Sequence, residues 1–121
     1  MKGFFLITIA TVLSVVLFPL GWFYSLFTFR ASIKKLDNYF KITAISIDQL
    51  GNVVMGTIFN DLMIKKGGHN FGNEDQTISM VLGLNKQTNT LNKFGKFWAS
   101  LLNKIEKNHV EKAIETCQKL N

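Results

Sequence analysis

The stretch from Gly3 to Phe29, GFFLITIATVLSVVLFPLGWFYSLFTF, contains no charged side chain in 27 residues and is bounded by Lys2 and Arg30. An α-helix rises about 1.5 Å per residue, so a helix of this length exceeds the roughly 30 Å hydrocarbon core of a bilayer. The sequence therefore predicts a transmembrane anchor over residues 1–30, followed by one small helical domain over residues 31–121.

The apolar run differs from a secretory signal, whose apolar core of about 7–15 residues precedes a cleavage site of small residues. This run is longer, and its last residues are bulky, with Trp22 and Tyr24 suited to a membrane interface. We expect an uncleaved helix that is kinked at Pro19. A re-entrant hairpin bent at Pro19 is the alternative, but each half would be too short to span.

The orientation of the anchor is predicted from the basic residues at its two ends. Lys2 lies on the N-terminal side, whereas Arg30, Lys34, Lys35 and Lys41 follow the run. Basic flanks favour the cytoplasmic side of a membrane. We therefore expect a single-pass protein with its N-terminus outside and its C-terminal domain in the cytoplasm.

The charge of the chain bears on its partners. The net charge is +6, and the part from Ala31 onward has 12 Lys against 8 acidic residues. Each Lys beside an anionic leaflet is attracted by about 1 kcal/mol, so the lipid bilayer is the expected partner, with a protein partner or a second copy as further candidates. Nucleic-acid binding is disfavoured because the chain has one Arg and no recognition motif. The single cysteine, Cys117, excludes an intrachain disulfide.

Four further helices are predicted from apolar residues that recur every three or four positions. They span residues 31–65, 75–83, 91–107 and 109–120. Gly83 is expected to end the second of them, and Asn108 with Glu111 matches a capping box at the start of the last. The expected fold class is all-α, an N-terminal transmembrane helix followed by a bundle of about four short helices.

A second membrane segment over residues 42–60 is the alternative for part of the first of these helices. This segment contains a single formal charge, Asp48, in 19 residues. Asp48, Gln49, Asn52 and Asn60 would nevertheless be costly inside a bilayer. A helix at the interface, or one packed within the small domain, is the preferred prediction.

No established catalytic signature occurs in the chain, and a set of polar residues remains as the candidate site. Its members are Asp48, Asn52, His69, Asp75, Thr77, Ser79 and His109. Structural polar contacts are the favoured interpretation. A metal or acid–base site, with Asp48, His69, Asp75 and His109 around a divalent ion, and a polar ligand pocket are the alternatives. No cofactor is expected outside the metal alternative.

Several of these residues lie in a pattern that extends over roughly positions 45–115. It comprises Ile47–Asn52 (IDQLGN), Gly68, the run Phe71–Ser79 (FGNEDQTIS), Val81–Gly83 and Lys107–His109. This pattern resembles a group of small uncharacterised membrane-anchored proteins of tailed phages and prophages. The resemblance implies a phage context and no particular reaction. The polarity of the core motif suggests that Asp75, Thr77 and Ser79 act together.

These observations predict a membrane-anchored accessory protein of unknown molecular activity, with a basic helical domain at the membrane surface. A non-enzymatic role is favoured by the missing catalytic signature, but the sequence leaves enzymatic activity open. A small membrane-bound metal-dependent hydrolase is one alternative. A holin-like lysis protein is the second, although the long remainder after the anchor argues against a pore former.

Overall fold

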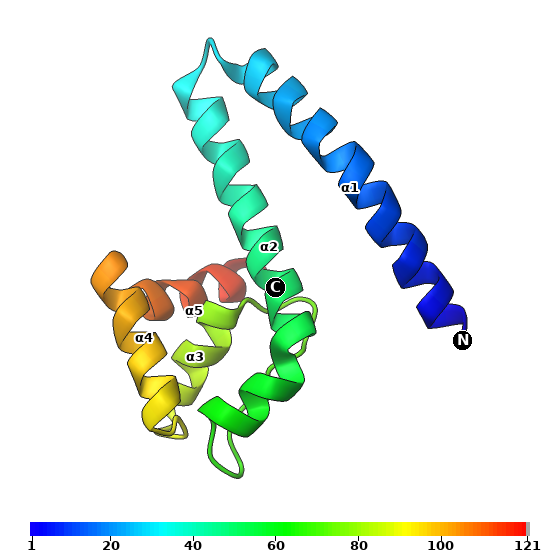
Figure 1. Ribbon diagram of the computed structural model, residues 1–121. Helices are drawn as coiled ribbons and strands as arrows, with labels where there is room; N and C mark the ends of the chain where they lie inside the picture. The colour runs from blue at the N-terminus through cyan, green and yellow to red at the C-terminus, as the bar shows by residue number, and fades with distance from the viewer. Residues whose placement is uncertain (121) are drawn as a thin grey trace. The chain divides into compact units, whose positions relative to one another are not determined.

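The computed structural model describes residues 1–120, with side chains through Thr116, so the Cys117 side chain lies outside the described part. Five α-helices and no strand occur in the described residues (Figure 1). They are α1 (Lys2–Phe29), α2 (Ile33–Met63), α3 (Ile78–Gln87), α4 (Lys93–Ile105) and α5 (His109–Leu120). The predicted all-α class is therefore confirmed.

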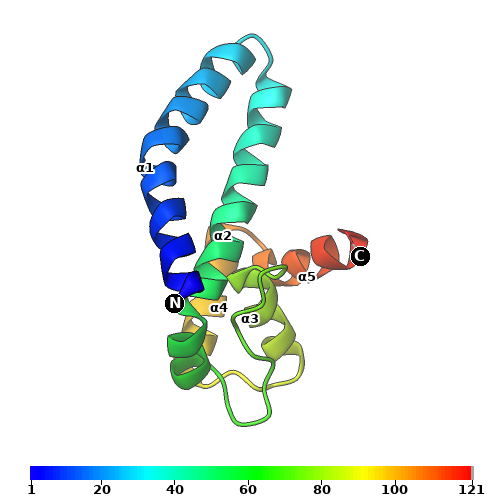
Figure 2. The same ribbon diagram turned by 90° about the vertical axis from the view of Figure 1, so that its right-hand side faces the viewer.

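Helix α1 runs without interruption through Pro19 and buries none of its residues (Figure 2). Four of its hydroxyl side chains are satisfied within the helix, because each donates to the carbonyl four residues earlier. These residues are Thr8, Thr11, Ser14 and Thr28. A helix that satisfies its own polar groups is compatible with a hydrocarbon environment.

Helix α2 is also long and apolar enough to cross a membrane, so the expectation of a single such helix was too narrow. The polar residues that would be costly in a second membrane segment form hydrogen bonds on one side of α2. Asp48, Asn52 and Asn60 bind backbone groups between Phe71 and Ile78. The remaining surface carries exposed apolar side chains, namely Ile47, Leu50, Val54, Ile58 and Leu62.

The chain divides into two units, residues 1–41 and residues 42–121, and the boundary lies inside α2. In the first unit, the ring of Trp22 lies 6.5 Å from that of Phe40, and the ring of Phe29 lies 5.8 Å from that of Tyr39. The first turns of α2 therefore pack with α1 in the first unit.

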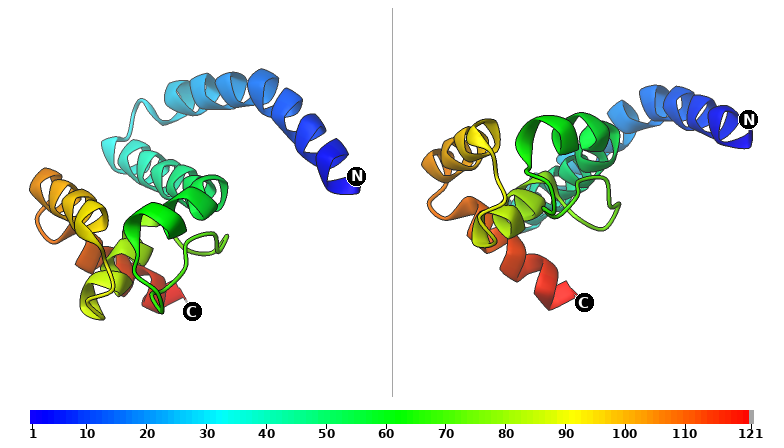
Figure 3. Two further views of the ribbon diagram at one scale, coloured as in Figure 1. Left: turned by 60° about the horizontal axis from the view of Figure 1, so that its bottom comes forward. Right: turned by 90° about the horizontal axis from the view of Figure 1, so that it is seen from below.

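The core of the second unit lies between its shorter helices. Its most completely buried apolar side chains are Val81, Leu82, Leu91 and Val110, each at most 1% exposed. Helix α3 contacts both α4 and α5, and these two also contact each other (Figure 3). Three helices of this unit thus enclose one small apolar core, to which Met63 at the end of α2 also contributes.

Helix α3 begins and ends later than predicted. Thr77 caps it by accepting a hydrogen bond from the Met80 N–H at 3.1 Å, and the helix continues past Gly83 to Gln87. Gly83 does not end the helix, because its role is to let α3 pass close to α5. A Cβ atom at this position would lie 2.4 Å from the Val110 carbonyl oxygen.

The last two helices are each capped by an asparagine side chain. Asn92 caps α4 by accepting from the Gly95 N–H at 3.0 Å. The predicted capping box at Asn108 is wrong, because Asn108 has φ +58° and not the extended backbone of an N-cap. Asn103 takes its place by accepting from the Val110 N–H at 3.1 Å.

Candidate functional site

A chain of hydrogen bonds connects Asp48, Ser79, His109 and Glu106 within the second unit. The Ser79 Oγ lies 3.1 Å from Asp48 Oδ2 and 3.1 Å from His109 Nε2. The other ring nitrogen, His109 Nδ1, lies 2.8 Å from Glu106 Oε2. Four side chains from α2, α3, α5 and the turn before α5 therefore form one continuous polar connection.

Ser79 is held at the N-terminal end of α3 by its neighbours. Asp48 Oδ1 accepts a hydrogen bond from the Ile78 N–H at 3.0 Å, one residue before Ser79. A carboxylate at a helix N-terminus is favoured by the helix dipole. Together with the Thr77 cap, this contact fixes the first turn of α3, and Ser79 is buried there at 5% exposure.

His109 is oriented from its outer side by Glu106. Glu106 lies three residues before His109 and also accepts from Lys112 Nζ at 3.0 Å. The hydrogen bond from His109, followed by that from Lys112, holds the pKa of Glu106 below its usual value. Glu106 is therefore ionised at neutral pH and is an acceptor for an Nδ1–H of His109.

The hydrogen bonds among these four side chains allow two arrangements of the protons, because the Ser79 hydroxyl has one hydrogen and two possible acceptors. If this hydrogen goes to Asp48, the His109 Nε2 must donate to Ser79 and the ring is an imidazolium. If it goes to His109, the ring is neutral and carries its proton on Nδ1, toward Glu106. A proton can therefore move between the serine and the histidine without any rearrangement of helices.

Three residues of this hydrogen-bonded series line a pocket of about 330 Å³. They are Asp48, Ser79 and His109. The rest of the lining is apolar and consists of Phe59, Met63, Ile78, Leu82, Trp98 and Leu102. An apolar cavity with a few convergent polar groups is typical of a ligand-binding site. The mixed lining of this pocket is compatible with an amphipathic molecule.

Asn52, another predicted site residue, has a structural role. It is fully buried, its Nδ2 donates to the carbonyls of Asn73 and Gln76 at 2.9 Å each, and its Oδ1 accepts from the Gly72 N–H at 3.2 Å. These bonds fix the glycine-containing loop to α2. Thr77 likewise serves as the α3 cap.

The predicted metal ligands do not gather at one point. His69 Nε2 bonds to Gln76 Oε1 at 2.9 Å, and the Asp75 carbonyl accepts from Gln49 at 3.3 Å. Of the four, Asp48 and His109 are joined through Ser79. Across the described residues, no group of three or more His, Cys, Asp or Glu side chains has the arrangement of a metal site.

Two contributors to the site region were missed at the level of sequence. Glu106 orients His109, and its position three residues earlier was the available signal. Asn103 binds the Glu111 carboxylate at 3.0 Å while capping α5. Glu111 also pairs with Lys86, and this contact holds the pKa of Glu111 below its usual value.

Helix α4 forms a second candidate surface because its small residues face inward. Gly95 and Ala99 are buried, whereas Phe94, Phe97 and Trp98 are 44%, 59% and 37% exposed. The Trp98 ring contacts both phenylalanine rings edge to face, at 6.2 and 5.9 Å. The inward position of Gly95 is required, because a Cβ there would lie 2.4 Å from the Met63 carbonyl oxygen. We call Phe94, Phe97, Trp98 and Ile105 the aromatic face of α4.

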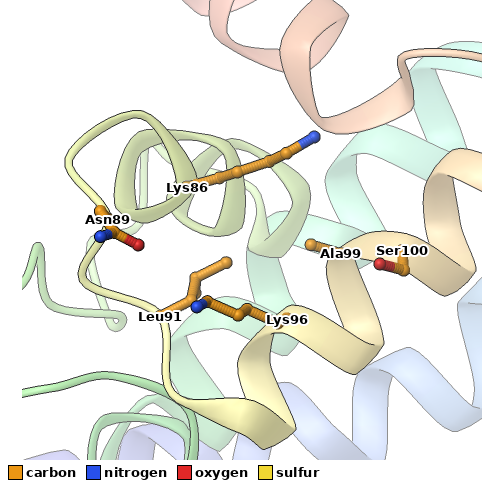
Figure 4. Close-up of a pocket in the computed structure, with 6 residues that line it drawn as sticks. All are labelled: Lys86, Asn89, Leu91, Lys96, Ala99 and Ser100. Atoms are coloured by element: carbon orange, nitrogen blue, oxygen red, sulfur yellow. The ribbon is translucent and has the colours of Figure 1, made fainter.

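Another hollow of about 270 Å³ lies between the end of α3 and α4. Lys86 and Lys96 both line it, together with Asn89, Leu91, Ala99 and Ser100 (Figure 4). The Lys86 ammonium is already paired with Glu111 and points away from Asn89 in this view. The hollow therefore lacks the convergent charges of an anion site.

No protein-family model, curated protein or solved structure matches this chain.

Proposed function

We propose that this chain is a membrane-anchored protein whose residues 42–121 dock on the bilayer surface through the aromatic face of α4. Helix α1 is the anchor in this proposal. The observation that carries it is the inverted packing of α4, with Gly95 and Ala99 inside and its aromatic residues in contact with solvent. A helix with aromatic residues on one side and lysines around them is typical of an interfacial membrane helix.

The energetics favour a lipid surface over water for this face. Full burial of one large apolar side chain contributes about 1.5–3 kcal/mol. Lys93, Lys96 and Lys104 lie on the same helix, and each basic residue near an anionic leaflet contributes about 1 kcal/mol. Contiguous exposed apolar patches on proteins mark interaction sites, and the lysines of α4 select an anionic one.

The proposal keeps the expected orientation, with the C-terminal domain in the cytoplasm, where the inner leaflet is anionic. Support comes from Arg30, Lys34, Lys35 and Lys41, which follow α1. The resemblance of the Gly72–Ser79 motif to proteins of phages and prophages supports an accessory role in a phage context. An ordered domain of three packed helices supports docking over pore formation.

Docking can be tested because the chain has two tryptophans, Trp22 and Trp98. The Trp22→Phe variant of the full chain, in nanodiscs, leaves Trp98 as the sole indole. We expect brominated acyl chains to quench Trp98 fluorescence, most strongly for bromines near the headgroup, because interfacial helices lie about 5–10 Å into the boundary.

Two controls make the quenching experiment specific. Neutralising Lys93, Lys96 and Lys104 with Gln should reduce quenching in anionic nanodiscs and have little effect in zwitterionic ones. Trp98 quenched by aqueous acrylamide but not by brominated lipid would contradict docking. Trp98 shielded from both quenchers would instead indicate a protein partner or a second copy on α4, and would also overturn the proposal.

A further inference from the structure

We propose that Ser79 is the nucleophile of an acyl-ester hydrolase site, with His109 as its general base and Glu106 as the residue that positions His109. The substrate class is an amphipathic ester whose acyl chain occupies the apolar pocket beside Ser79. This activity is independent of the docking proposed for α4, because none of its reacting groups belongs to the aromatic face.

The geometry of the three residues is that of an activated nucleophile. A serine and its base lie within hydrogen-bond reach in such sites, and a third group orients the base. Here the Ser79 Oγ to His109 Nε2 distance is 3.1 Å, and the His109 Nδ1 to Glu106 Oε2 distance is 2.8 Å. The histidine uses one nitrogen for the serine and the other for the carboxylate, as a Ser-His-acid triad requires.

The surroundings of Ser79 contribute in two ways. The serine lies in the first turn of the ten-residue helix α3, which is fixed because the N–H groups of Ile78 and Met80 donate to Asp48 and Thr77. In the arrangement with a neutral His109, the Ser79 hydrogen goes to His109 Nε2, while Asp48 Oδ2 lies 3.1 Å from the Ser79 Oγ and Asp48 Oδ1 accepts from the Ile78 N–H. The imidazolium that forms during the reaction then lies between two carboxylates, Asp48 beyond Ser79 and Glu106 on its outer side.

The pocket determines the class of substrate. Ser79 is 5% exposed and is reached through a cavity whose other walls are Phe59, Met63, Leu82, Trp98 and Leu102. Such walls bind an acyl chain and offer no partner to a sugar or a peptide backbone. Trp98 belongs both to this lining and to the aromatic face of α4. An ester from the bilayer and a free ester share the required chemistry.

The reaction proceeds in two balanced steps. The Ser79 Oγ attacks the ester carbonyl carbon while its proton passes to His109 Nε2, and this proton then leaves with the alcohol as the ester C–O bond breaks. A water molecule next attacks the acyl-serine and gives its proton to His109. Ser79 is released with that proton, and the acyl chain leaves as a carboxylic acid.

The direct test is labelling of the full chain in nanodiscs with an alkyl fluorophosphonate, followed by peptide mass spectrometry. The serine oxygen displaces fluoride from phosphorus, so an activated serine is labelled whatever its natural substrate. We expect one label per chain on Ser79, and a rate at least about 100-fold lower in His109→Gln, because general-base catalysis contributes about 10²–10⁴-fold. Ser100→Ala, in the other hollow, should label like wild type.

Positioning by Glu106 has its own readout. Glu106→Gln replaces the carboxylate, which favours a charged ring, with a neutral amide, so the pH profile of labelling should move to lower pH. Glu111→Gln is the matched control, because Glu111 binds Lys86 and Asn103 and does not contact His109. An unmoved profile in Glu106→Gln would show that Glu106 has no role in the reaction and would overturn its assignment.

Two substrates distinguish an ester of the bilayer from a free ester. Fatty acid released from nanodisc phospholipid assigns the bilayer, whereas cleavage of p-nitrophenyl octanoate alone assigns a free ester. The proposal is overturned if the wild-type chain, folded by circular dichroism, leaves Ser79 unlabelled. Trp98 quenching in the same sample reports docking separately, so loss of one result does not imply loss of the other.

Discussion

Among the residues whose side chains are described, Asn52 and Asn85 are the two polar ones with no solvent exposure, and each completes the hydrogen bonds of a loop backbone. Asn85 donates to the carbonyls of His69 and Val81 and accepts from the His69 N–H at 2.8 Å. Asn52 performs the same role for residues 72–76. Buried backbone groups need partners, so these two amides replace the secondary structure that the loop lacks.

The Asn52→Leu substitution should destabilise the second unit strongly. It removes three hydrogen bonds and leaves the carbonyls of Asn73 and Gln76 and the N–H of Gly72 without this partner. Each buried group left unsatisfied costs about 1–3 kcal/mol, so we expect a loss of about 3 kcal/mol or more. For a domain of this size, that lowers the Tm by roughly 10–20 °C.

Thermal unfolding followed by circular dichroism in nanodiscs measures this loss. Asn38→Leu is the matched control on the same helix, because Asn38 is exposed. A Tm of Asn52→Leu within about 2 °C of the control would be inconsistent with the assigned role, since single surface changes stay within about 0.5 kcal/mol.

The sequence identified part of the site and could not identify the rest, for a physical reason. Asp48, Ser79 and His109 were chosen as polar residues able to meet, and they are joined. Glu106 and Asn103 could not be predicted, because the partner of an amide or carboxylate depends on which backbone or ring atom the folded chain leaves unsatisfied. That information arises only once loops and helices have been placed.

At the scale of elements, helical periodicity predicted which residues form helices. It did not predict whether protein or another medium covers the apolar face of each helix. The helix predicted over residues 91–107 is α4, but its apolar period is divided between a core side of small residues and an exposed aromatic side. Hydrophobic spacing reports that one face avoids water. It does not report whether protein or lipid covers that face, because both media are apolar.

The space beside two helical glycines predicts opposite effects of alanine substitution on stability, and Gly83, where α3 passes close to α5, is the first of them. Gly83→Ala places a Cβ 2.4 Å from the Val110 carbonyl oxygen, which is backbone and cannot rotate away. Overpacking of this kind costs about 1–3 kcal/mol and exceeds the gain of about 1 kcal/mol from replacing glycine in a helix. We therefore expect Gly83→Ala to lower the Tm.

Gly51→Ala provides the matched comparison. Its new Cβ would meet only the Ile78 Cδ1 at 3.1 Å, the end of a flexible side chain. The propensity gain should then dominate, and the Tm should stay unchanged or rise by a few degrees. Equal effects of the two substitutions in the same thermal scans would show that α3 and α5 do not constrain each other at Gly83.

At the scale of the whole molecule, the number of membrane crossings follows from what covers α2. Length and composition allow α2 to cross. Its side toward the loop, however, binds residues 71–79 through Asp48, Asn52 and Asn60, and this loop carries Glu74 and Asp75. A spanning α2 would take these charges into hydrocarbon, which is costly. We therefore expect α1 to cross and α2 to remain on one side with the domain that it begins.

Cysteine accessibility tests this expectation in a Cys117→Ser background. Single cysteines are introduced by Ala31→Cys, between α1 and α2, and by Lys66→Cys, after α2, and are probed in intact cells with a membrane-impermeant maleimide. With one crossing, both positions lie on the same side, and the basic residues after α1 place that side in the cytoplasm. Both should therefore stay unlabelled until the membrane is permeabilised. Labelling of one position and not the other in intact cells would mean that α2 crosses the membrane, and the contacts of Asp48, Asn52 and Asn60 would then have to open on insertion.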